Sequence, residues 1–213
     1  MRLTSWLLSS ICLLASAAQA EPVLHGGGHC QPTASIITRN YPGASEINDI
    51  NYLQLPAGKA IEAPGQKVLI EGQVLDDACV PVSNAIVEIW QNDPYGRWIL
   101  ANPEDLADSK PVFDGAGRTS TDNQGVFHFI TLFPAASGGM APNFNIRILA
   151  HPLHPFATVL YFANDRHNAS DKRFSKLSAS ARQSVSIRVD DSTDLLKGKI
   201  TIVLWGKIPY RGY

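Results

Sequence analysis

The stretch from Val68 to Trp98 constrains the fold more than any other part of this 213-residue chain. It contains two runs rich in β-branched and apolar residues, 68–75 and 85–91, separated by a polar segment that includes Cys79. Two such runs with a turn between them are typical of a β-hairpin. The sequence therefore predicts that the two runs form neighbouring antiparallel strands.

The second run has two largely apolar faces. Ile86, Glu88 and Trp90 lie on one face of an extended strand, and Val87 and Ile89 lie on the other with Gln91. A strand with two apolar faces is typical of a central position in a sandwich. The predicted fold is therefore all-β, a sandwich of mostly antiparallel strands with an extended N-terminal arm and short helical excursions.

The rest of the chain supplies more short strands and few helices. Strands are predicted at residues 126–130, 145–150, 157–162, 184–189 and 200–205. In the first of these, Phe127 and Phe129 face one side and His128 the other, so His128 is expected at the surface. A helical turn is predicted at 103–110 and a short helix within 166–181, while Leu204 and Trp205 are expected in the core.

Four blocks carry a resemblance to a known family. They are GQVLDDACVPVSNAIVEIWQNDPYGRW at 72–98, FDGAGRTSTDNQGVFHFITLFP at 113–134, MAPNFNIRILA at 140–150 and LYF at 160–162. In this order they resemble the intradiol ring-cleavage dioxygenases, and ordered blocks are more specific than one short motif. The resemblance implies a fold in which two tyrosinates and two histidines hold a ferric ion that binds a catecholate.

None of the ligand types that the resemblance implies stands at its expected position. Trp98 ends the G-R-aromatic motif where the family has a tyrosine, and Ser137 takes the place of the second tyrosine. Asn143 and Asn145 stand where the family has its two histidines, and Met140 replaces an arginine. An indole N–H donates a hydrogen bond but does not bind a metal. We therefore expect no cofactor, although ferric iron is the cofactor of the family.

The resemblance also points to pocket residues. Tyr41 stands near a family segment that lines the pocket or packs at a subunit contact, and the alternative is an arm tyrosine that packs on the sandwich. His151 falls where a pocket arginine occurs, and Tyr161 lies in the LYF block. With Met140, these residues are the pocket candidates.

The leading functional expectation is a protein related to aromatic (catechol or protocatechuate) catabolism that lacks the ferric site. The chain is most similar to the iron-free α chains of protocatechuate 3,4-dioxygenases, which implies an iron-bearing homologous subunit as partner. A homo-oligomer and the binding of a small aromatic ligand stay open.

Two alternatives remain. The first is an active dioxygenase with displaced ligands, taken from Tyr95, Tyr161, His151 and His154. The second is a sandwich that serves only as an interaction or carbohydrate-binding module, because fold does not imply function.

The first residues are typical of an export signal. Residues 1–20 combine Arg2, a short apolar run and an A-x-A site that ends at Ala20. A periplasmic or secreted protein is expected after cleavage, with an arm at 21–64 and one sandwich domain at 65–213. No other run is long enough to span a membrane, and 18 basic against 19 acidic residues give no reason to bind nucleic acid.

Two cysteines follow the predicted signal. An oxidising compartment favours a bond between Cys30 and Cys79, the alternative being two free thiols. Secreted proteins that resemble the family carry a similar pair, which would tie the arm to the sandwich. His25 and His29 could join Cys30 in a metal site, but the three glycines between the histidines favour a flexible leader, so no metal site is predicted.

Overall fold

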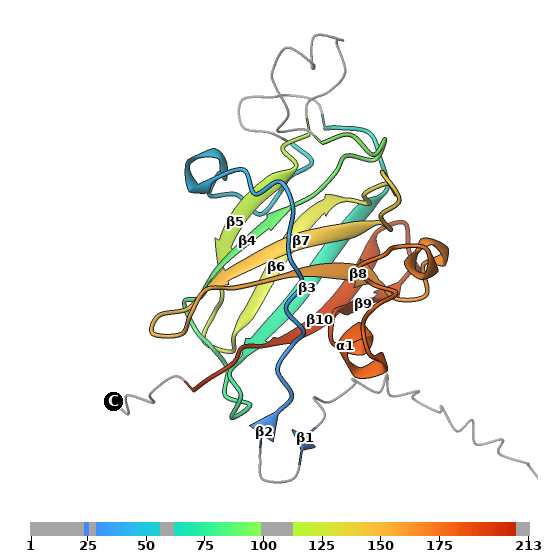
Figure 1. The fold of residues 1–213 in the computed structure, drawn as a ribbon. Coiled ribbons are helices and arrows are strands. Elements are labelled where there is room, and N and C mark those ends of the chain that lie inside the picture. The colour runs from blue at the N-terminus through green and yellow to red at the C-terminus, as the bar shows by residue number, and fades with distance from the viewer. Residues whose placement is uncertain (1–23, 26–28, 56–61, 99–112, 208–213) are drawn as a thin grey trace, which may run out of the picture.

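The structure is a computed structural model that describes residues 24–25, 29–55, 62–98 and 113–207 (Figure 1). The predicted signal at 1–20, the helical turn at 103–110 and the glycines between His25 and His29 lie outside these residues. The elements, in chain order, are β1 (Leu24–His25), β2 (His29–Cys30), η1 (Ala44–Glu46), β3 (Lys67–Leu75), β4 (Ile86–Trp90), β5 (Ala116–Ser120), β6 (Val126–Leu132), β7 (Asn143–Leu149), β8 (Phe156–Phe162), η3 (Arg166–Ala169), α1 (Ala179–Ser184), β9 (Ser186–Asp190) and β10 (Leu196–Val203).

Eight strands form a mixed, nearly closed sandwich in the order β5-β4-β7-β8-β9-β10-β3-β6. The half β5-β4-β7-β8 is antiparallel throughout, and the other half contains one parallel pair, β10 with β3. A short parallel contact between β8 and β9 joins the two halves. The all-β sandwich predicted from the alternating runs is therefore confirmed.

The core fills the space between the two halves. Its largest buried side chains alternate along the strands with residues that face outward, as period-two patterning requires. On β3 the inward position of Gly72 carries no side chain because the ring of Phe127 occupies that space. A Cβ at Gly72 would lie 2.1 Å from the Cζ atom of that ring. This is why the inward positions of β3 are hard to recognise in the sequence.

The hairpin predicted for residues 68–75 and 85–91 is wrong. Both runs form strands, but β3 pairs with β6 and β10, whereas β4 pairs with β5 and β7. Val82 and Ala85, in the connection, are buried in the core. The connection therefore carries the chain across the sandwich from one half to the other instead of turning within one sheet. The central position predicted for the second run is confirmed.

The end of β10 also differs from the expectation. Leu204 is buried as predicted, but the side chain of Trp205 is 79% exposed. The strand ends at Val203, and the chain turns outward at Gly206 with a positive φ of 97°. The alternation of a strand therefore does not continue to Trp205, which explains why the prediction of a core tryptophan is wrong.

The N-terminal arm runs across the outer face of one half of the sandwich, as the blue trace shows (Figure 1). Its contacts visit successive strands: Thr33 with Val203, Ala34 with Thr158, Arg39 with Asn145, Tyr41 with Glu88, Asp49 with Arg118, and Leu53 with Ile130. The strands contacted are, in turn, β10, β8, β7, β4, β5 and β6. The arm therefore covers this face and connects the two halves at both of its ends.

A disulfide fixes the start of the arm. Cys30 is bonded to Cys79, with their Cα atoms 5.2 Å apart, so the predicted pairing is present in the structure. The half-cystines pack against Leu75 and Val203 in a small buried cluster, and the Cys30 N–H donates to the Asp77 carbonyl at 2.9 Å. The bond joins the arm to the connection that follows β3.

Candidate functional site

The outer face of β4, β5 and β7 carries a row of charged side chains at matched positions. Glu88 on β4 is in register with Arg118 on β5 and with Arg147 on β7. Because residues directly opposite each other on paired strands place their side chains on the same face, the carboxylate lies between two guanidinium groups. The arm covers this row, which leaves Glu88 only 1% exposed.

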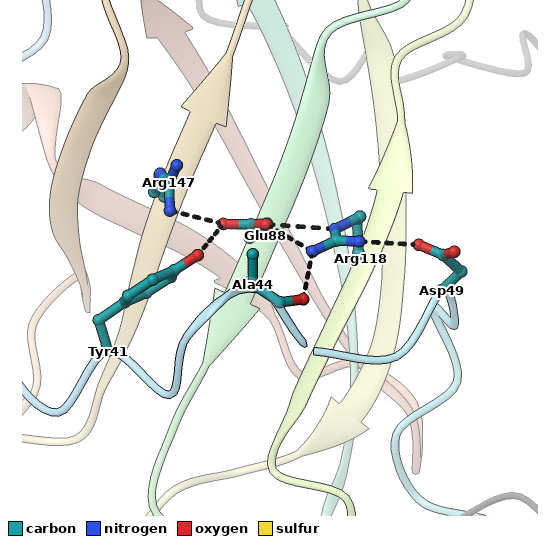
Figure 2. Close-up of polar contacts among 6 residues, drawn as sticks. All are labelled: Tyr41, Ala44, Asp49, Glu88, Arg118 and Arg147. Atoms are coloured by element: carbon teal, nitrogen blue, oxygen red, sulfur yellow. Dashed lines mark hydrogen bonds and ion pairs between the residues drawn. The ribbon is translucent and has the colours of Figure 1, made fainter. Parts of the chain in front are cut away.

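The Glu88 carboxylate has four polar contacts with three residues, Arg118, Arg147 and Tyr41 (Figure 2). One oxygen accepts from Arg118 Nε at 3.2 Å and from its Nη2 at 2.9 Å. The other oxygen lies 3.5 Å from Arg147 Nη1 and accepts from the Tyr41 hydroxyl at 3.2 Å. Arg118 also donates to the Ala44 carbonyl at 2.9 Å, so the network joins the three strands β4, β5 and β7 with the arm.

Tyr41 packs on the sheet. Its ring meets the ring of Trp90 edge-on at 5.3 Å between centroids, and the Arg147 guanidinium lies 4.8 Å from the centre of its ring. Burial and the Glu88 carboxylate raise the pKa of its phenol. The placement matches the second of the two alternatives for Tyr41, an arm tyrosine that packs on the sandwich.

The two asparagines at the histidine positions of the family lie on β7 and face the same side as Arg147. The amide of Asn145 is hydrogen bonded through both of its polar atoms: its oxygen accepts from the Arg39 N–H at 3.3 Å, and its nitrogen donates to the Trp90 carbonyl at 3.3 Å. The amide nitrogen of Asn143 donates to the Ala141 carbonyl at 2.6 Å. Both side chains therefore hold neighbouring backbone in place.

The two tyrosine positions of the family lie in loops at the same end of the sheet. Trp98 packs against the cluster of Ile47, Trp90 and Ala116. Ser137 makes a pair of backbone hydrogen bonds with Met140, and a Cβ placed on Gly96 would lie 3.2 Å from the Ser137 Cβ. The loop that contains Trp98 and the loop that contains Ser137 therefore touch.

These positions do not fit ferric iron. Trp98 and Met140 have no anionic oxygen, Ser137 is a neutral hydroxyl, and the Asn145 amide is committed to backbone groups. Ferric sites of this family type need phenolate and imidazole donors. Among the described residues, no three His, Cys, Asp or Glu side chains lie close enough together to hold a metal ion.

The residues considered as displaced ligands are not brought together. His151 and His154 lie exposed in the turn between β7 and β8. Tyr161 is paired with Asn143, at the opposite end of these strands. Tyr95 lies in the loop after β4 with a ring that is 60% exposed. The two histidines are therefore separated from both tyrosines by the length of the sheet.

Sequence reasoning missed a buried polar cluster beside Asn143. Tyr161 is fully buried, and its hydroxyl has no hydrogen-bond partner among the described residues. Close to it are Asp171, which accepts from the Ala141 N–H at 3.1 Å, and Arg173. The residues come from β8 and from the polar segment that follows it, in which no sequence pattern marks Arg173 as a buried residue.

Burial raises the pKa of Tyr161 to about 12, from an ordinary value of 10.0. The neutral phenol therefore stabilises the fold fully below about pH 10, and this contribution is lost as the pH rises through 12. We expect Tyr161→Phe to unfold at neutral pH no more easily than the wild type, because it removes an unpartnered hydroxyl. Its free energy of unfolding should fall less at high pH, by up to about 3 kcal/mol.

Urea unfolding measured from pH 7 to pH 12 checks this prediction. The matched control is Tyr95→Phe, which removes a hydroxyl from an exposed ring and should follow the wild-type profile. Equal alkaline losses in Tyr161→Phe and the wild type would contradict the assignment.

A surface depression of about 570 Å³ opens beside Arg118. Its other lining residues are Asp49, Asn51, Ile86, Thr119 and Ser120.

His128 is exposed on β6, as predicted, and its Nε2 atom lies 3.2 Å from Glu71 Oε2. Across the part of the chain that the structure describes, no helix is long and apolar enough to cross a membrane.

Comparisons with known proteins agree with this geometry. A family model described as "Dioxygenase" matches residues 44–145. The α chain of protocatechuate 3,4-dioxygenase from Burkholderia cepacia is 31% identical over 147 residues, which cover 67% of this chain and 73% of that relative. The β chain from the same organism is 36% identical over 95 residues, which cover 44% of this chain and only 40% of that relative.

The structure also resembles solved structures. An intradiol ring-cleavage dioxygenase from Tetranychus urticae superposes with a TM-score of 0.67 at 19% identity, covering 85% of this chain and 98% of that one. At this identity the likeness concerns the fold alone. Together with the sequence relatives, it agrees with the sandwich and with the ordered blocks, and the chain belongs to the intradiol ring-cleavage dioxygenase family.

Proposed function

We propose that this chain is an iron-free member of its family that binds small aromatic compounds without cleaving them, either alone or as the non-catalytic partner of an iron-bearing homologue. The observation that carries the proposal is the replacement of the ligand set at Trp98, Ser137, Asn143 and Asn145. The neighbours of these residues strengthen it, because Asn145 is hydrogen bonded through both of its polar atoms and Trp98 is packed against the cluster of Ile47, Trp90 and Ala116.

The partner role is supported by the relatives. One is named as an α chain and another as a β chain of protocatechuate 3,4-dioxygenase, so the family contains members with two kinds of chain. A chain without its own ligands is useful in such an assembly if it supplies surface to a shared site. A homo-oligomer would serve the binding role equally well.

Export is part of the proposal. The disulfide between Cys30 and Cys79 supports it, because structural disulfides persist mainly in oxidising compartments. The predicted signal at residues 1–20 also favours export. The protein would then meet aromatic compounds in the periplasm or outside the cell.

The alternative of an active enzyme with displaced ligands is less well supported. It needs His151 and His154 to act with Tyr95 or Tyr161, and these side chains lie at opposite ends of the sheet. A metal site needs its ligands and their supporting contacts within one small region. The other alternative is a sandwich that serves only as an interaction module. It gives no role to the loops around Trp98, which resemble those of the family.

The test is to incubate the purified protein with catechol or protocatechuate in air, with and without added ferric iron. Equilibrium dialysis measures binding, and chromatography measures the remaining diol. We expect binding with no ring-opened product under either condition. Iron-dependent conversion of the diol contradicts the iron-free proposal, and the absence of binding contradicts the binding role. Co-expression with an iron-bearing homologue tests the partner role by whether the two chains purify together.

A further inference from the structure

Positive charge is concentrated in the segment that joins β8 to β9. Residues 165–182, which we call the basic lobe, hold five of the 18 Lys and Arg residues of the chain but only two of its 19 Asp and Glu residues. The lobe therefore carries a formal net charge of +3 in a chain whose formal net charge is −1. In Figure 1 it is the orange region beside β8 and β9, and it contains η3 and the first part of α1.

The two carboxylates of the basic lobe are occupied within the fold. Asp165 accepts from the His167 N–H at 2.8 Å, at the start of η3. Asp171 accepts from three backbone N–H groups at 2.8 to 3.2 Å, and its ion pair is with Arg173, whose guanidinium nitrogens are buried. Both carboxylates therefore hold turns in place and do not neutralise the surface of the lobe.

Four cations of the basic lobe remain on its surface. Arg166, Lys172, Lys176 and Arg182 are all exposed. In the part of the chain that the structure describes, the ion pairs of the lobe involve only His167 and Arg173. Four like charges without a paired carboxylate raise the local electrostatic potential and attract anions.

Hydrogen bonds bring these cations onto one surface. The Ser175 N–H donates to the Asp171 carbonyl at 2.9 Å, so the chain makes a helical turn that places Lys172 and Lys176 on the same side. Arg182 donates through Nη2 to the Ser175 carbonyl at 2.6 Å, which fixes it beside the same turn. The cations are therefore spread over an exposed surface that a long ligand can follow.

We propose that the basic lobe is a docking surface for an acidic polysaccharide, a polymer of sugars that carries sulfate, phosphate or carboxylate groups. A polymer with repeated charges can meet several separated cations at once and releases its condensed counterions when it does so. Exposed hydroxyls at Ser175, Ser178 and Ser180 lie among the cations and suit the hydroxyl groups of the sugars.

Other polyanions fit the basic lobe less well. Proteins that bind single-stranded nucleic acid stack the bases on exposed aromatic rings, and helices that lie on membranes combine cations with exposed apolar residues. The single aromatic residue of the lobe, Phe174, packs on Tyr161 at 4.9 Å between ring centroids, and the Arg182 guanidinium covers it at 5.6 Å. None of the large exposed hydrophobic residues that the structure describes lies in the lobe.

The test compares dextran sulfate with dextran, an uncharged polymer of the same sugar, by isothermal titration calorimetry of the purified protein. We expect dextran sulfate to bind and dextran not to bind. When NaCl is raised from about 50 to about 200 mM, the dissociation constant should rise roughly 30-fold, because about four cations take the place of condensed counterions.

The double variant Lys172→Gln, Lys176→Gln removes half of these cations. It should bind dextran sulfate about tenfold more weakly at low salt, and the effect of salt should fall to about fivefold. The matched control, Lys67→Gln, Lys199→Gln, changes the net charge equally at exposed lysines that lie 2.9 and 3.2 Å from Glu62 and Glu71. Its affinity for dextran sulfate should equal that of the wild type. All four lysines are at the surface, so unchanged urea midpoints are expected for both variants.

The polysaccharide surface is supported if dextran sulfate binds and only the variant of Lys172 and Lys176 loses affinity. Equal losses in both double variants overturn it, because the net charge of the chain would then explain the binding. Tighter binding to single-stranded DNA or to phosphatidylglycerol vesicles than to dextran sulfate overturns the choice of partner. Since no aromatic ligand takes part, each of these results leaves the proposed aromatic-binding function unaffected.

Discussion

Replacing Glu88 by alanine is expected to lower the free energy of unfolding by about 3 kcal/mol or more. Glu88 is 1% exposed and is the shared partner of Arg118, Arg147 and Tyr41. Its loss leaves the guanidinium groups of Arg118 and Arg147, 22% and 28% exposed, without their shared buried partner, and Arg118 keeps only the exposed carboxylate of Asp49. Removing one partner of a buried ion network costs more than the network contributes, because the remaining charges stay desolvated.

The urea midpoint of Glu88→Ala measures this effect, and Glu71→Ala is the matched control. Glu71 is also a strand residue with two partners, Lys199 and His128, but its side chain is 40% exposed. Exposed ion pairs contribute about 1 kcal/mol or less, so the control should lose little stability. Similar midpoints for the two variants would contradict the account of Glu88 as the group that holds the arm on the sheet.

Reducing the disulfide is expected to cost a similar amount, about 4 kcal/mol. Cys30 and Cys79 are 49 residues apart in sequence, and the bond removes the entropy of that loop from the unfolded chain. The arm should stay on the sheet after reduction, because Thr33 still exchanges hydrogen bonds with Val203. We therefore expect a folded but less stable protein.

Urea unfolding with and without dithiothreitol measures the contribution of the disulfide. The double variant Cys30→Ala, Cys79→Ala is the control, since it has no bond to reduce and its midpoint should not depend on the reductant. The reduced wild type should approach the midpoint of this variant. A wild-type midpoint that the reductant leaves unchanged would show that the bond does not stabilise the fold.

Much of the fold follows from local pattern. The alternation of residues 86–91 correctly separates the inward from the outward positions of β4, and the strands β6, β7 and β8 lie close to where the sequence predicts them. Which strands pair with each other does not follow from local pattern. A polar connection between two strands is compatible with a hairpin and with a crossing between sheets, and only the burial of Val82 and Ala85 distinguishes the two.

The sequence indicates one member of the charged row, Glu88, but not its partners. Glu88 stands in a strand whose two faces are otherwise apolar, and an acidic residue buried there needs cationic partners. Its partners lie 30 and 59 positions further along the chain, at Arg118 and Arg147, and Tyr41 lies 47 positions before it. No local pattern connects residues so far apart, so the network becomes evident only when the register is known.

The sequence likewise predicts one part of the candidate site and not the other. The replaced ligand positions follow from the ordered motifs, because those motifs fix the positions one by one. Arg173 could not be found, because the segment around it is polar and gives no periodicity that would mark a buried guanidinium. Burial of Arg173 depends on the turn that Asp171 closes against Ala141, a contact between residues 30 positions apart.

Iron binding tests the central claim most directly. The purified protein is incubated with ferric iron, separated from free metal, and measured for iron content and visible absorbance, with an iron-bearing relative treated in parallel. A chain whose ligand positions are Trp98, Ser137, Asn143 and Asn145 is predicted to stay colourless and to retain no stoichiometric iron. Stoichiometric iron with a tyrosinate-to-iron charge-transfer band would contradict the account and establish a ferric site built from other residues.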